Sequence, residues 1–541
     1  MISSPVTQSA FQLIWSWFHM SRARKNIQYI YRAEEMSSLT ILGGILLCAV
    51  AVRLALRKRL RLCLPPSPPA DVLIGHLRVL PDPQVTPEVF YKWSLKYGDV
   101  FSLSVPGKTI IVVNSEKAAN ELLEKRSAIY SDRARMAYYD YIGWKDAVIF
   151  APYGPFHARQ RKLYQDAFGK NVVSEYRSIQ EREANTLLKG LLDEPANFDS
   201  LSKRFAGGVV TEIGYGHRID SFTDGFFSVG DRFAKIAGMG ANPSLLDLHP
   251  IFAYLPSWAP GAATIKFIKE TKPFMDAIVH DNHKKVVQQM KNGTARLSFT
   301  AKHLEAAFGK EHDSEEERAV RLGAAMIFTA GFETTWHFLV IFIAAMLLHP
   351  DAQQKAREEL DRVVGRDRLP DFNDRESLQY VQCVINEVLR WNPVNPIGFP
   401  HRVMEDDVYN GMHIPKGAIV IPNTRAFTWE QSKFHDAKLF KPQRFLPKPE
   451  GSGEVLPPSL FWGWGRRVCA GRYLAEGSLF TAVSRILAVF TISPLKDAKG
   501  HLIQPEIKFI TNTSRHTEPF TCNIQPRDVR ARDLIIESCQ D

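Results

Sequence analysis

Residues 322–348 form the longest apolar stretch inside the body of the chain, and nearly every position of this stretch is hydrophobic. A helix that is apolar all round belongs either in the centre of a large protein or in a membrane. Glu333 and His337 lie near its middle, and ionisable side chains are costly at the centre of a bilayer. We therefore predict a buried central helix at 322–348.

The segments around this helix have patterns in which polar and apolar residues repeat. Residues 351–365 and 376–391 have the hydrophobic period of amphipathic helices, and a further helical pattern covers 472–490. Two β-rich runs, 100–105 and 109–113, are separated by a Pro-Gly-Lys turn and predict a hairpin. Most of the chain from 115 to 437 is helical in pattern. The fold class that we predict is mainly α with small β-sheets (α+β).

The amino-terminal part of the chain predicts a membrane anchor. Residues 37–56 are apolar apart from Arg53 and long enough to span a bilayer as a helix. Residues 57–72 form a basic, proline-rich linker, whose positive charge favours a cytosolic catalytic domain over 73–541. The alternative is a cleaved signal peptide, but no convincing small-residue cleavage site follows. Two interpretations of the extension 1–36 stay open: an interfacial amphipathic helix, or a segment ahead of a true start at Met36.

Composition narrows the function classes. The chain has 541 residues, of which 45% are hydrophobic and 23% charged, so a large core is available. Its six cysteines lie far apart without a CxxC pair, which argues against a zinc site and against a disulfide framework. The net charge is +10, but no basic block is interleaved with aromatic residues. We therefore expect no nucleic-acid partner, and expect the basic linker to face anionic lipid of the bilayer.

The most specific motif is the loop from Trp462 to Gly471, where three glycines bracket Cys469. Few side chains obstruct such a loop, so a flat ligand can lie close to its backbone. The helix that follows directs its N-terminal dipole at the sulfur, and the preceding Arg466 and Arg467 add positive charge. These features favour a thiolate facing a planar cofactor, which suggests a haem iron. The alternative is a free cysteine in a glycine turn.

The spacing of Gly463, Gly465, Arg467, Cys469 and Gly471 resembles the haem-binding loop of the cytochrome P-450 family of haem-thiolate monooxygenases. The resemblance covers roughly residues 65–527. It implies the cytochrome P-450 fold and haem with Cys469 as the axial iron ligand. It also implies O2 as co-substrate and electrons from NADPH through a separate cytochrome P-450 reductase, with cytochrome b5 as a further candidate donor. The expected location is the endoplasmic reticulum membrane.

A second motif lies inside the central helix at residues 330–335. A threonine in a helix can donate its hydroxyl to a carbonyl one turn back and open the helix locally. Gly331 removes a side chain at the same place, where a ligand can press against the helix. The motif resembles the oxygen-activating motif of the family, which implies catalytic roles for Thr334 as the alcohol and Glu333 as its acid neighbour.

The resemblance also assigns roles to residues elsewhere in the chain. It implies that Arg467, Arg161 and Arg402 neutralise the haem propionates, and that His157 replaces a tryptophan usual in the family. Trp462 replaces a phenylalanine, and we hypothesise that its indole donates a hydrogen bond to the sulfur. Segments 132–152 and 245–260 are expected at the substrate pocket and its entrance. Further expected cofactor contacts are Gly463 and Gly331; an expected structural ion-pair triad is Glu387, Arg390 and Arg444; expected substrate-pocket residues are Val394, Ile397, Phe328 and Thr513.

Together these features predict a membrane-bound haem-thiolate monooxygenase that oxidises a lipophilic small molecule. The overall resemblance is to fungal members that oxidise terpenoids or polyketides in secondary metabolism. One alternative is an O2-independent haem-thiolate isomerase or dehydratase, a class that often lacks the helix alcohol. Another is a non-catalytic haem-binding protein, for which the aromatic-rich segments would have no use. The presence of Thr334 and Glu333 favours oxygen activation.

Overall fold

The computed structural model describes residues 64–240, 245–248, 250–255, 262–305, 315–511 and 514–540. The extension 1–36, the anchor 37–56, the first part of the linker and Thr513 lie outside the described residues. The membrane anchor and the pocket role of Thr513 therefore stay predictions.

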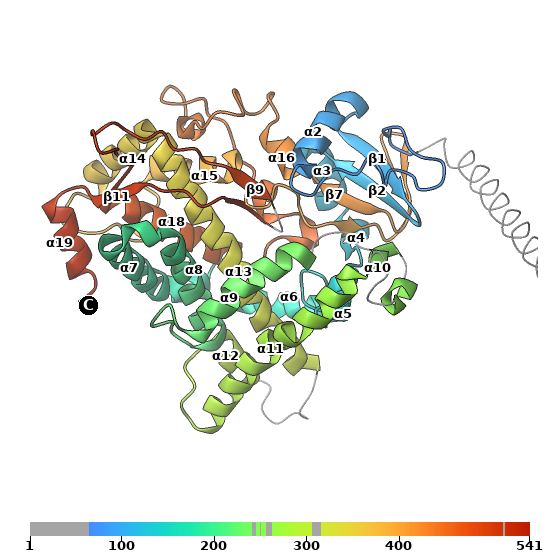
Figure 1. The fold of residues 1–541 in the computed structure, drawn as a ribbon, viewed down its shortest axis with the longest axis horizontal. Coiled ribbons are helices and arrows are strands. Elements are labelled where there is room, and N and C mark those ends of the chain that lie inside the picture. The colour runs from blue at the N-terminus through green and yellow to red at the C-terminus, as the bar shows by residue number, and fades with distance from the viewer. Residues whose placement is uncertain are drawn as a thin grey trace, which may run out of the picture.

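Helices make up most of the described chain (Figure 1). The α-helices of two turns or more are α2 (Thr86–Tyr97), α6 (Pro155–Phe168), α7 (Arg177–Asp193), α8 (Phe198–Tyr215), α9 (Gly225–Gly240), α11 (Ala263–Lys291), α12 (Phe299–Glu305), α13 (Glu315–Leu348), α14 (Pro350–Val363), α15 (Gln379–Trp391), α18 (Arg472–Val489) and α19 (Val529–Glu537). Shorter ones are α3 (Glu116–Ala119), α4 (Ser127–Tyr130), α5 (Ala137–Tyr141), α10 (Leu245–Leu248), α16 (Thr424–Thr428) and α17 (Ser459–Trp462).

Helix α13 is the centre of the helical body, as predicted. It runs diagonally through the middle of the molecule in Figure 1 and packs against α6, α8 and α18. Among the described helices it is the one long and apolar enough to cross a membrane, yet 78% of its most apolar window is buried inside the protein. Burial on nearly every face explains why its sequence carries no amphipathic period.

A small mixed sheet lies to one side of this body. Its strand order is β1-β2-β7-β4-β3, with β1 (Val100–Val105), β2 (Lys108–Val113), β7 (Ile419–Pro422), β4 (His401–Arg402) and β3 (Asp132–Arg133). The predicted hairpin is present, with β1 and β2 antiparallel and Gly107 in its turn at a φ of 75°. The remaining strands pair as β5 (Asp407–Tyr409) with β6 (Met412–Ile414), β8 (Phe490–Ser493) with β11 (Asn523–Pro526), and β9 (Phe509–Thr511) with β10 (Arg515–Thr517).

The described end of the proline-rich linker is fixed to the sheet. Ser102 of β1 donates its backbone N–H to the Pro66 carbonyl and its hydroxyl to the Pro65 carbonyl, both at 2.7 Å. The ring of His76 lies 2.9 Å from the Pro68 carbonyl. The proline residues of the predicted linker at 65–68 are thus held against strand β1. Because proline keeps its carbonyl acceptor, a proline run can still dock on a strand.

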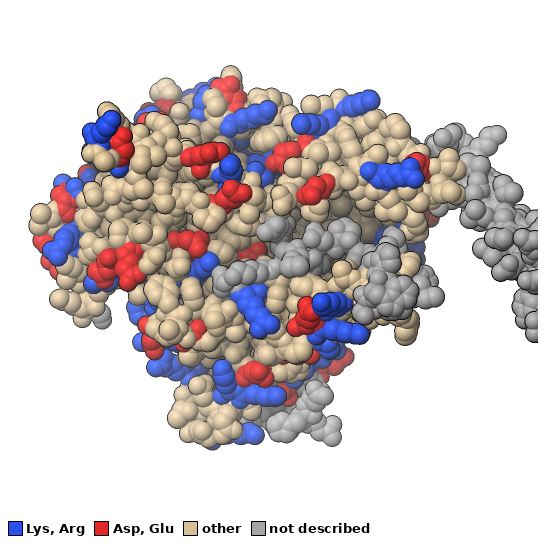
Figure 2. Space-filling model, in the orientation of Figure 1, with Lys and Arg blue, Asp and Glu red and all other residues tan. Residues whose placement is uncertain are grey.

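Charged side chains of both signs are interspersed over the face of the molecule seen in Figure 2. Elsewhere on the surface, charged pairs form along helices, as for Lys272 with Asp276 and Lys266 with Glu270. Exposed pairs of this kind contribute little to stability.

The predicted ion-pair triad is brought together between helix α15 and the loop that carries Arg444. Glu387 and Arg390 lie on one face of α15, and their side chains are fully buried. Arg444 reaches the same carboxylate from a later loop, with 3.1 Å between its Nε and Glu387 Oε1. The three buried groups thus join α15 to the segment that leads towards the Cys469 loop.

Candidate active site

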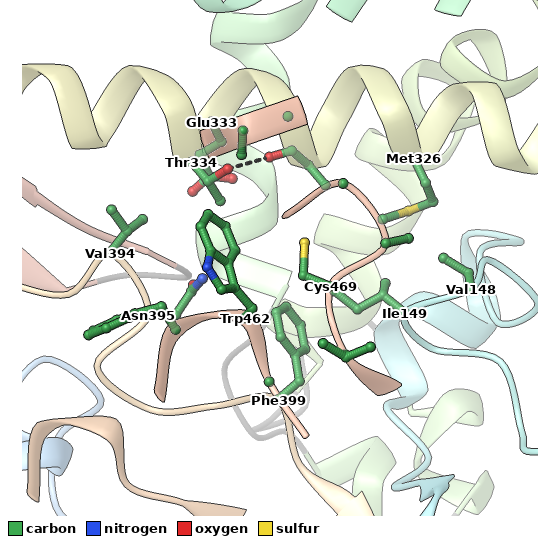
Figure 3. A pocket seen from close by; sticks show the side chains of 18 of the residues that line it. Val148, Ile149, Met326, Glu333, Thr334, Val394, Asn395, Phe399, Trp462 and Cys469 are labelled. Carbon is green, nitrogen blue, oxygen red and sulfur yellow. Dashed lines mark hydrogen bonds between the residues drawn. The ribbon is translucent and has the colours of Figure 1, made fainter. Parts of the chain in front are cut away.

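A cavity of about 370 Å³ lies between α13 and the loop before α18. Figure 3 shows the Cys469 side chain pointing across this cavity towards α13, with Thr334 and Glu333 on the opposite wall. The space is narrow and mostly apolar, with aromatic side chains from several elements in its walls. It lies within the size range of small-molecule and cofactor sites.

The Cys469 loop has the tight geometry that its glycines allow. Gly463 and Gly465 have φ angles of 79° and 53°, a region that L-residues with a side chain rarely adopt. A Cβ on Gly465 would come within 2.5 Å of the Leu123 carbonyl, so this position has no room for another residue. The loop closes on itself through Cys469 N–H, which donates to the Trp462 carbonyl at 2.5 Å.

The electrostatics of the thiol combine two opposing effects. Burial raises the pKa of Cys469, whereas the Gly471 N–H and the charges of Arg161 and Arg472 lower it. Burial is the larger effect, so the protein alone does not favour the thiolate as the sequence suggested. A thiol that coordinates a metal ion is deprotonated by the ion itself. The sulfur is enclosed by protein yet accessible from the cavity.

Three arginines, one buried and two half-buried, and one buried histidine contribute to the lining of the cavity. Arg133, Arg161 and Arg467 line the cavity, and burial lowers the pKa of each, to about 9 for Arg133 and about 10 for Arg467. The Arg467 guanidinium donates to the carbonyls of Ser131, Val148 and Ala151. Arg161 donates to the Val468 carbonyl at 2.7 Å.

His157 stands beside these arginines in the cavity wall. It is 2% exposed, and neither ring nitrogen has a hydrogen-bond partner among the described residues. Burial and the nearby arginine charges lower its pKa to about 3, so the ring is neutral. A cluster of largely enclosed cations next to a buried imidazole without a partner is unfavourable unless anions complete it.

Arg402 is a correction to the sequence analysis. Its side chain is 50% exposed and lies 3.4 Å from Asp132, outside the cavity. In the two-residue strand β4 successive side chains point to opposite faces, and here the buried His401 is the one at the cavity. Arg133, whose strand β3 pairs with β4, lines the cavity where Arg402 was expected.

The opposite wall carries the predicted alcohol and acid. Thr334 donates its hydroxyl to the Ala330 carbonyl at 2.9 Å, the bond one turn back that the motif predicted. Glu333 is 7% exposed, lines the cavity and accepts a hydrogen bond from Ser514. Burial raises the pKa of Glu333 to about 7, with the Ser514 bond acting in the opposite direction. Gly331 also lines the cavity, although the space left by its missing side chain faces Val210 of α8.

Two predicted pocket residues lie elsewhere. Phe328 packs against Phe226 and Phe332 on the far side of α13, away from the cavity. Ile397 packs against the cluster of Phe90, Phe101, Leu103 and Val112 beside the sheet. Val394 does line the cavity, together with Asn395 and Phe399 from the same segment (Figure 3).

Trp462 lines the cavity next to Cys469, as Figure 3 shows. Its contact with the cysteine is the backbone bond described above. Across the described chain its indole makes no hydrogen bond to the sulfur, so the hypothesis of an N–H donor to Sγ is not supported.

The residues present fit a haem. A thiol accessible from one side of the cavity offers a soft axial ligand, and the three arginines with His157 offer a cradle for two carboxylates. The expected cations Arg161 and Arg467 line the cavity together with Arg133, and these three side chains would hold the haem carboxylates. When bound, haem supplies the O–O cleavage and oxidising chemistry, which an axial thiolate favours.

A haem-thiolate oxygenase is the class of protein that this fold and cavity define. The cytochrome P-450 family model matches residues 65–518. Cytochrome P-450 monooxygenase 176 of Postia placenta is 35% identical over 92% of this chain and 97% of its own. Cytochrome P-450 monooxygenase claR of Ampulloclitocybe clavipes is 37% identical, covering 87% and 88%.

The fold has a solved relative as well. A zebra fish cytochrome P-450, described as a structure with abiraterone, superposes with a TM-score of 0.68 at 24% identity, covering 83% of this chain and 99% of that one. The chain therefore belongs to the cytochrome P-450 family. It is a monooxygenase of the fungal type with a haem-thiolate cofactor, and its reaction uses O2, a small-molecule substrate and a redox partner.

Proposed function

We propose that this monooxygenase is anchored by residues 37–56 in the endoplasmic reticulum membrane with its catalytic domain in the cytosol. It takes electrons from NADPH through a membrane-bound cytochrome P-450 reductase, with cytochrome b5 as a further donor. It oxidises a lipophilic molecule of the terpenoid or polyketide class. The fungal relatives and the apolar segment followed by basic residues support this proposal.

The cavity wall carries the proposal for a lipophilic substrate. Apart from the arginine cluster, most of the cavity lining consists of aromatic and aliphatic side chains. Members of this apolar lining are Tyr139, Trp144, Val210, Phe233 and Phe399. The cationic side chains of the lining, Arg133, Arg161 and Arg467, are those that fit the haem carboxylates. An anionic substrate would find no cation left to pair with among the described lining residues.

The direct test supplies the purified full-length protein in lipid vesicles with its reductase, NADPH and isotopically labelled dioxygen. Ethoxycoumarin, a neutral lipophilic molecule, serves as the probe. Hydroxylation of a ring carbon should place one labelled oxygen atom in the product, whereas loss of the ethyl group should leave hydroxycoumarin unlabelled and carry the label into the released acetaldehyde; neither product should form without NADPH. Turnover that proceeds without NADPH or dioxygen would contradict the monooxygenase mechanism proposed for this site.

Within this function, Thr334 and Glu333 handle protons on the α13 side of the cavity. The Thr334 hydroxyl, held by the Ala330 carbonyl, faces the space across from the Cys469 sulfur. Glu333 has a pKa of about 7, so its carboxyl group can release and regain a proton near neutral pH. The surrounding apolar wall excludes bulk water, which leaves proton delivery to these side chains.

Thr334→Ala is expected to uncouple NADPH consumption from product formation. The variant loses the hydroxyl that positions the proton donor, so that the electrons end in hydrogen peroxide. Product formed per NADPH should fall by about 10²-fold, the lower end of what positioned proton transfer contributes. The measurement compares NADPH, peroxide and oxidised ethoxycoumarin. Thr334→Ser keeps the hydroxyl and should couple like the native protein; equal coupling in Thr334→Ala would remove the role of Thr334.

The coupling should also depend on pH. Because burial raises the Glu333 pKa to about 7, the carboxyl group is neutral below that pH and ionised above it. We expect the share of NADPH that ends as peroxide to rise as the pH increases through 7, since the proton donor is lost. Glu333→Gln cannot ionise and should show a high peroxide share without this pH dependence. A pH dependence that persists in Glu333→Gln would assign the titration to another group.

A further inference from the structure

Behind Glu333 lies a chain of polar side chains that leads away from the cavity. Ser514, in the turn before β10, donates its hydroxyl to Glu333 Oε1. The Nδ1 atom of His337, one turn further along α13, lies 2.7 Å from the same hydroxyl oxygen. Both Ser514 and His337 are at most 3% exposed. Glu333 thus connects on one side to the cavity and on the other to a buried serine and histidine.

The hydrogen bonds that link Glu333, Ser514 and His337 can form with their donors in either of two directions. An ionised carboxylate only accepts, so with Glu333 ionised the serine hydroxyl donates to it and must accept from His337 Nδ1–H. With Glu333 protonated, its O–H can donate to Ser514, whose hydroxyl then donates to an unprotonated His337 Nδ1. The Glu333–Ser514 contact and the Ser514–His337 contact are each satisfied in both arrangements. This reversibility is the property that a hydrogen-bonded path needs to pass a proton.

Other titratable and charged groups lie around this hydrogen-bonded path. His516 of β10 stacks on His337 with 4.7 Å between ring centroids. Asp199 and Lys203 of α8 pair at 3.1 Å, and Asp199 is 46% exposed. Tyr139 of α5 faces Glu333 from the cavity side. Burial, His516 and Lys203 hold the pKa of His337 well below its ordinary value, so its ring is neutral.

We propose that Ser514 and His337 form a proton relay that reloads Glu333 from the α8 side of the protein. In this transfer the hydroxyl proton of Ser514 passes to a Glu333 carboxylate oxygen, and the Nδ1 proton of His337 replaces it on Ser514. As His337 gives up the Nδ1 proton it takes one from bulk water at Nε2, so the ring stays neutral and ends as the Nε2–H tautomer. Rotation of the ring and proton exchange with bulk water restore the Nδ1–H tautomer before the next transfer. One proton therefore moves inward for each one that Glu333 releases into the cavity, and no atom is oxidised or reduced.

This relay rests on the proposed role of Glu333 as proton donor, and the two ideas fail in different ways. If Glu333→Gln coupled like the native protein, the donor role and the relay would both fall. If Glu333→Gln uncoupled while the Ser514 and His337 variants behaved like the native protein, only the relay would fall.

The first measurement needs no turnover. Infrared spectra of the purified holoprotein are recorded across the pH range, and subtraction of the Glu333→Gln spectra isolates the neutral carboxyl band of Glu333. Ser514→Ala removes a hydrogen bond to the ionised form, so the midpoint of this band should rise by about 1–2 pH units. Ser514→Thr keeps a hydroxyl and should restore the midpoint. A native midpoint in Ser514→Ala would overturn the contact on which the relay depends.

The second measurement separates a relay from mere positioning. Asparagine at 337 places an amide N–H near the position of Nδ1, so His337→Asn keeps a donor for Ser514 but cannot pass a proton. We expect its carboxyl midpoint to stay near the native one while the peroxide share of NADPH oxidation rises several-fold, measured with ethoxycoumarin. A native peroxide share in His337→Asn would overturn the relay and leave Ser514 and His337 as positioning residues.

Two matched variants control for changes in a buried site. Ser202→Ala removes a buried hydroxyl that bonds only within α8, to the Phe198 carbonyl. His283→Asn removes a buried histidine that lies 3.1 Å from Glu317, on α11 and away from the cavity. Both should keep the native midpoint and the native peroxide share. A shift in either would show that the effects at 514 and 337 are not specific to the relay.

Discussion

Cys469→Ser is expected to abolish the strongly red-shifted Soret band of the dithionite-reduced, carbon monoxide-treated protein, and NADPH-driven oxidation with it. Serine keeps the size of the side chain, but its oxygen replaces the soft, electron-rich sulfur ligand that favours O–O cleavage. Activity should fall to that of free haem. The absorption difference spectrum of the purified protein checks the band directly, before any substrate is known.

The exposed Cys539 provides the control for this variant. It lies at the carboxyl-terminal end, where its sulfur is 3.6 Å from the Asn185 carbonyl, far from the cavity lining. Cys539→Ser should keep the red-shifted band unchanged. A native band in Cys469→Ser, or a native protein whose band matches histidine-ligated haem, would contradict ligation by Cys469. A correctly folded protein that binds no haem at all would contradict the site as a whole.

The predictable part of the site came from residues whose backbone context is unusual. The Cys469 loop was recognisable because Gly465 has no room for a side chain and Gly463 has a positive φ. The Thr334 position was recognisable because it combines a hydroxyl and a neighbouring acid in an otherwise apolar helix. Such positions leave a local signature in the sequence, because few other residue types can replace them.

The misplaced residues lacked such a signature. On a helix that is apolar all round, the sequence pattern does not tell which side of the helix faces the cavity. In the structure the Phe328 side chain lies on another side and packs against Phe226. In the two-residue strand β4 a shift of one position exchanges the inward and outward side chains, which placed Arg402 wrongly. Arg133 was missed because its role depends on the pairing of β3 with β4, residues that are far apart in the chain.

The relay partners of Glu333 were beyond sequence analysis for the same reason. Ser514 lies 181 residues from Glu333, and one serine in a turn carries no sign of a buried carboxylate partner. His337 was visible as a polar residue in an apolar helix, but its partner was not. A buried polar residue in such a helix is a signal that a distant hydrogen-bond partner exists, because an unpaired one would be costly.

Glu387→Gln is expected to lower the free energy of unfolding by about 3–5 kcal/mol, the usual cost of leaving buried charges without their partner. Glu387 accepts hydrogen bonds from Arg390 Nε at 2.7 Å and Nη2 at 2.8 Å, from Arg444 Nε and from the Lys441 backbone N–H. A glutamine can accept on only one of its two terminal atoms, and its NH2 group faces arginine donors. Urea unfolding of the holoprotein, followed by tryptophan fluorescence and circular dichroism, measures the loss.

The size of this effect follows from burial rather than from the ion pair as such. Glu121→Gln removes, by the same substitution, a surface carboxylate that pairs with Lys125 and Arg126, and it should cost far less than Glu387→Gln. Arg390 also donates to the Thr428, Ala437 and Leu439 carbonyls, so the triad holds the segment that precedes the Cys469 loop. Haem should therefore dissociate from Glu387→Gln at a lower urea concentration than the one that unfolds the helices. Equal losses in Glu387→Gln and Glu121→Gln would show that the buried triad does not support the loop, and that packing alone keeps Cys469 in place.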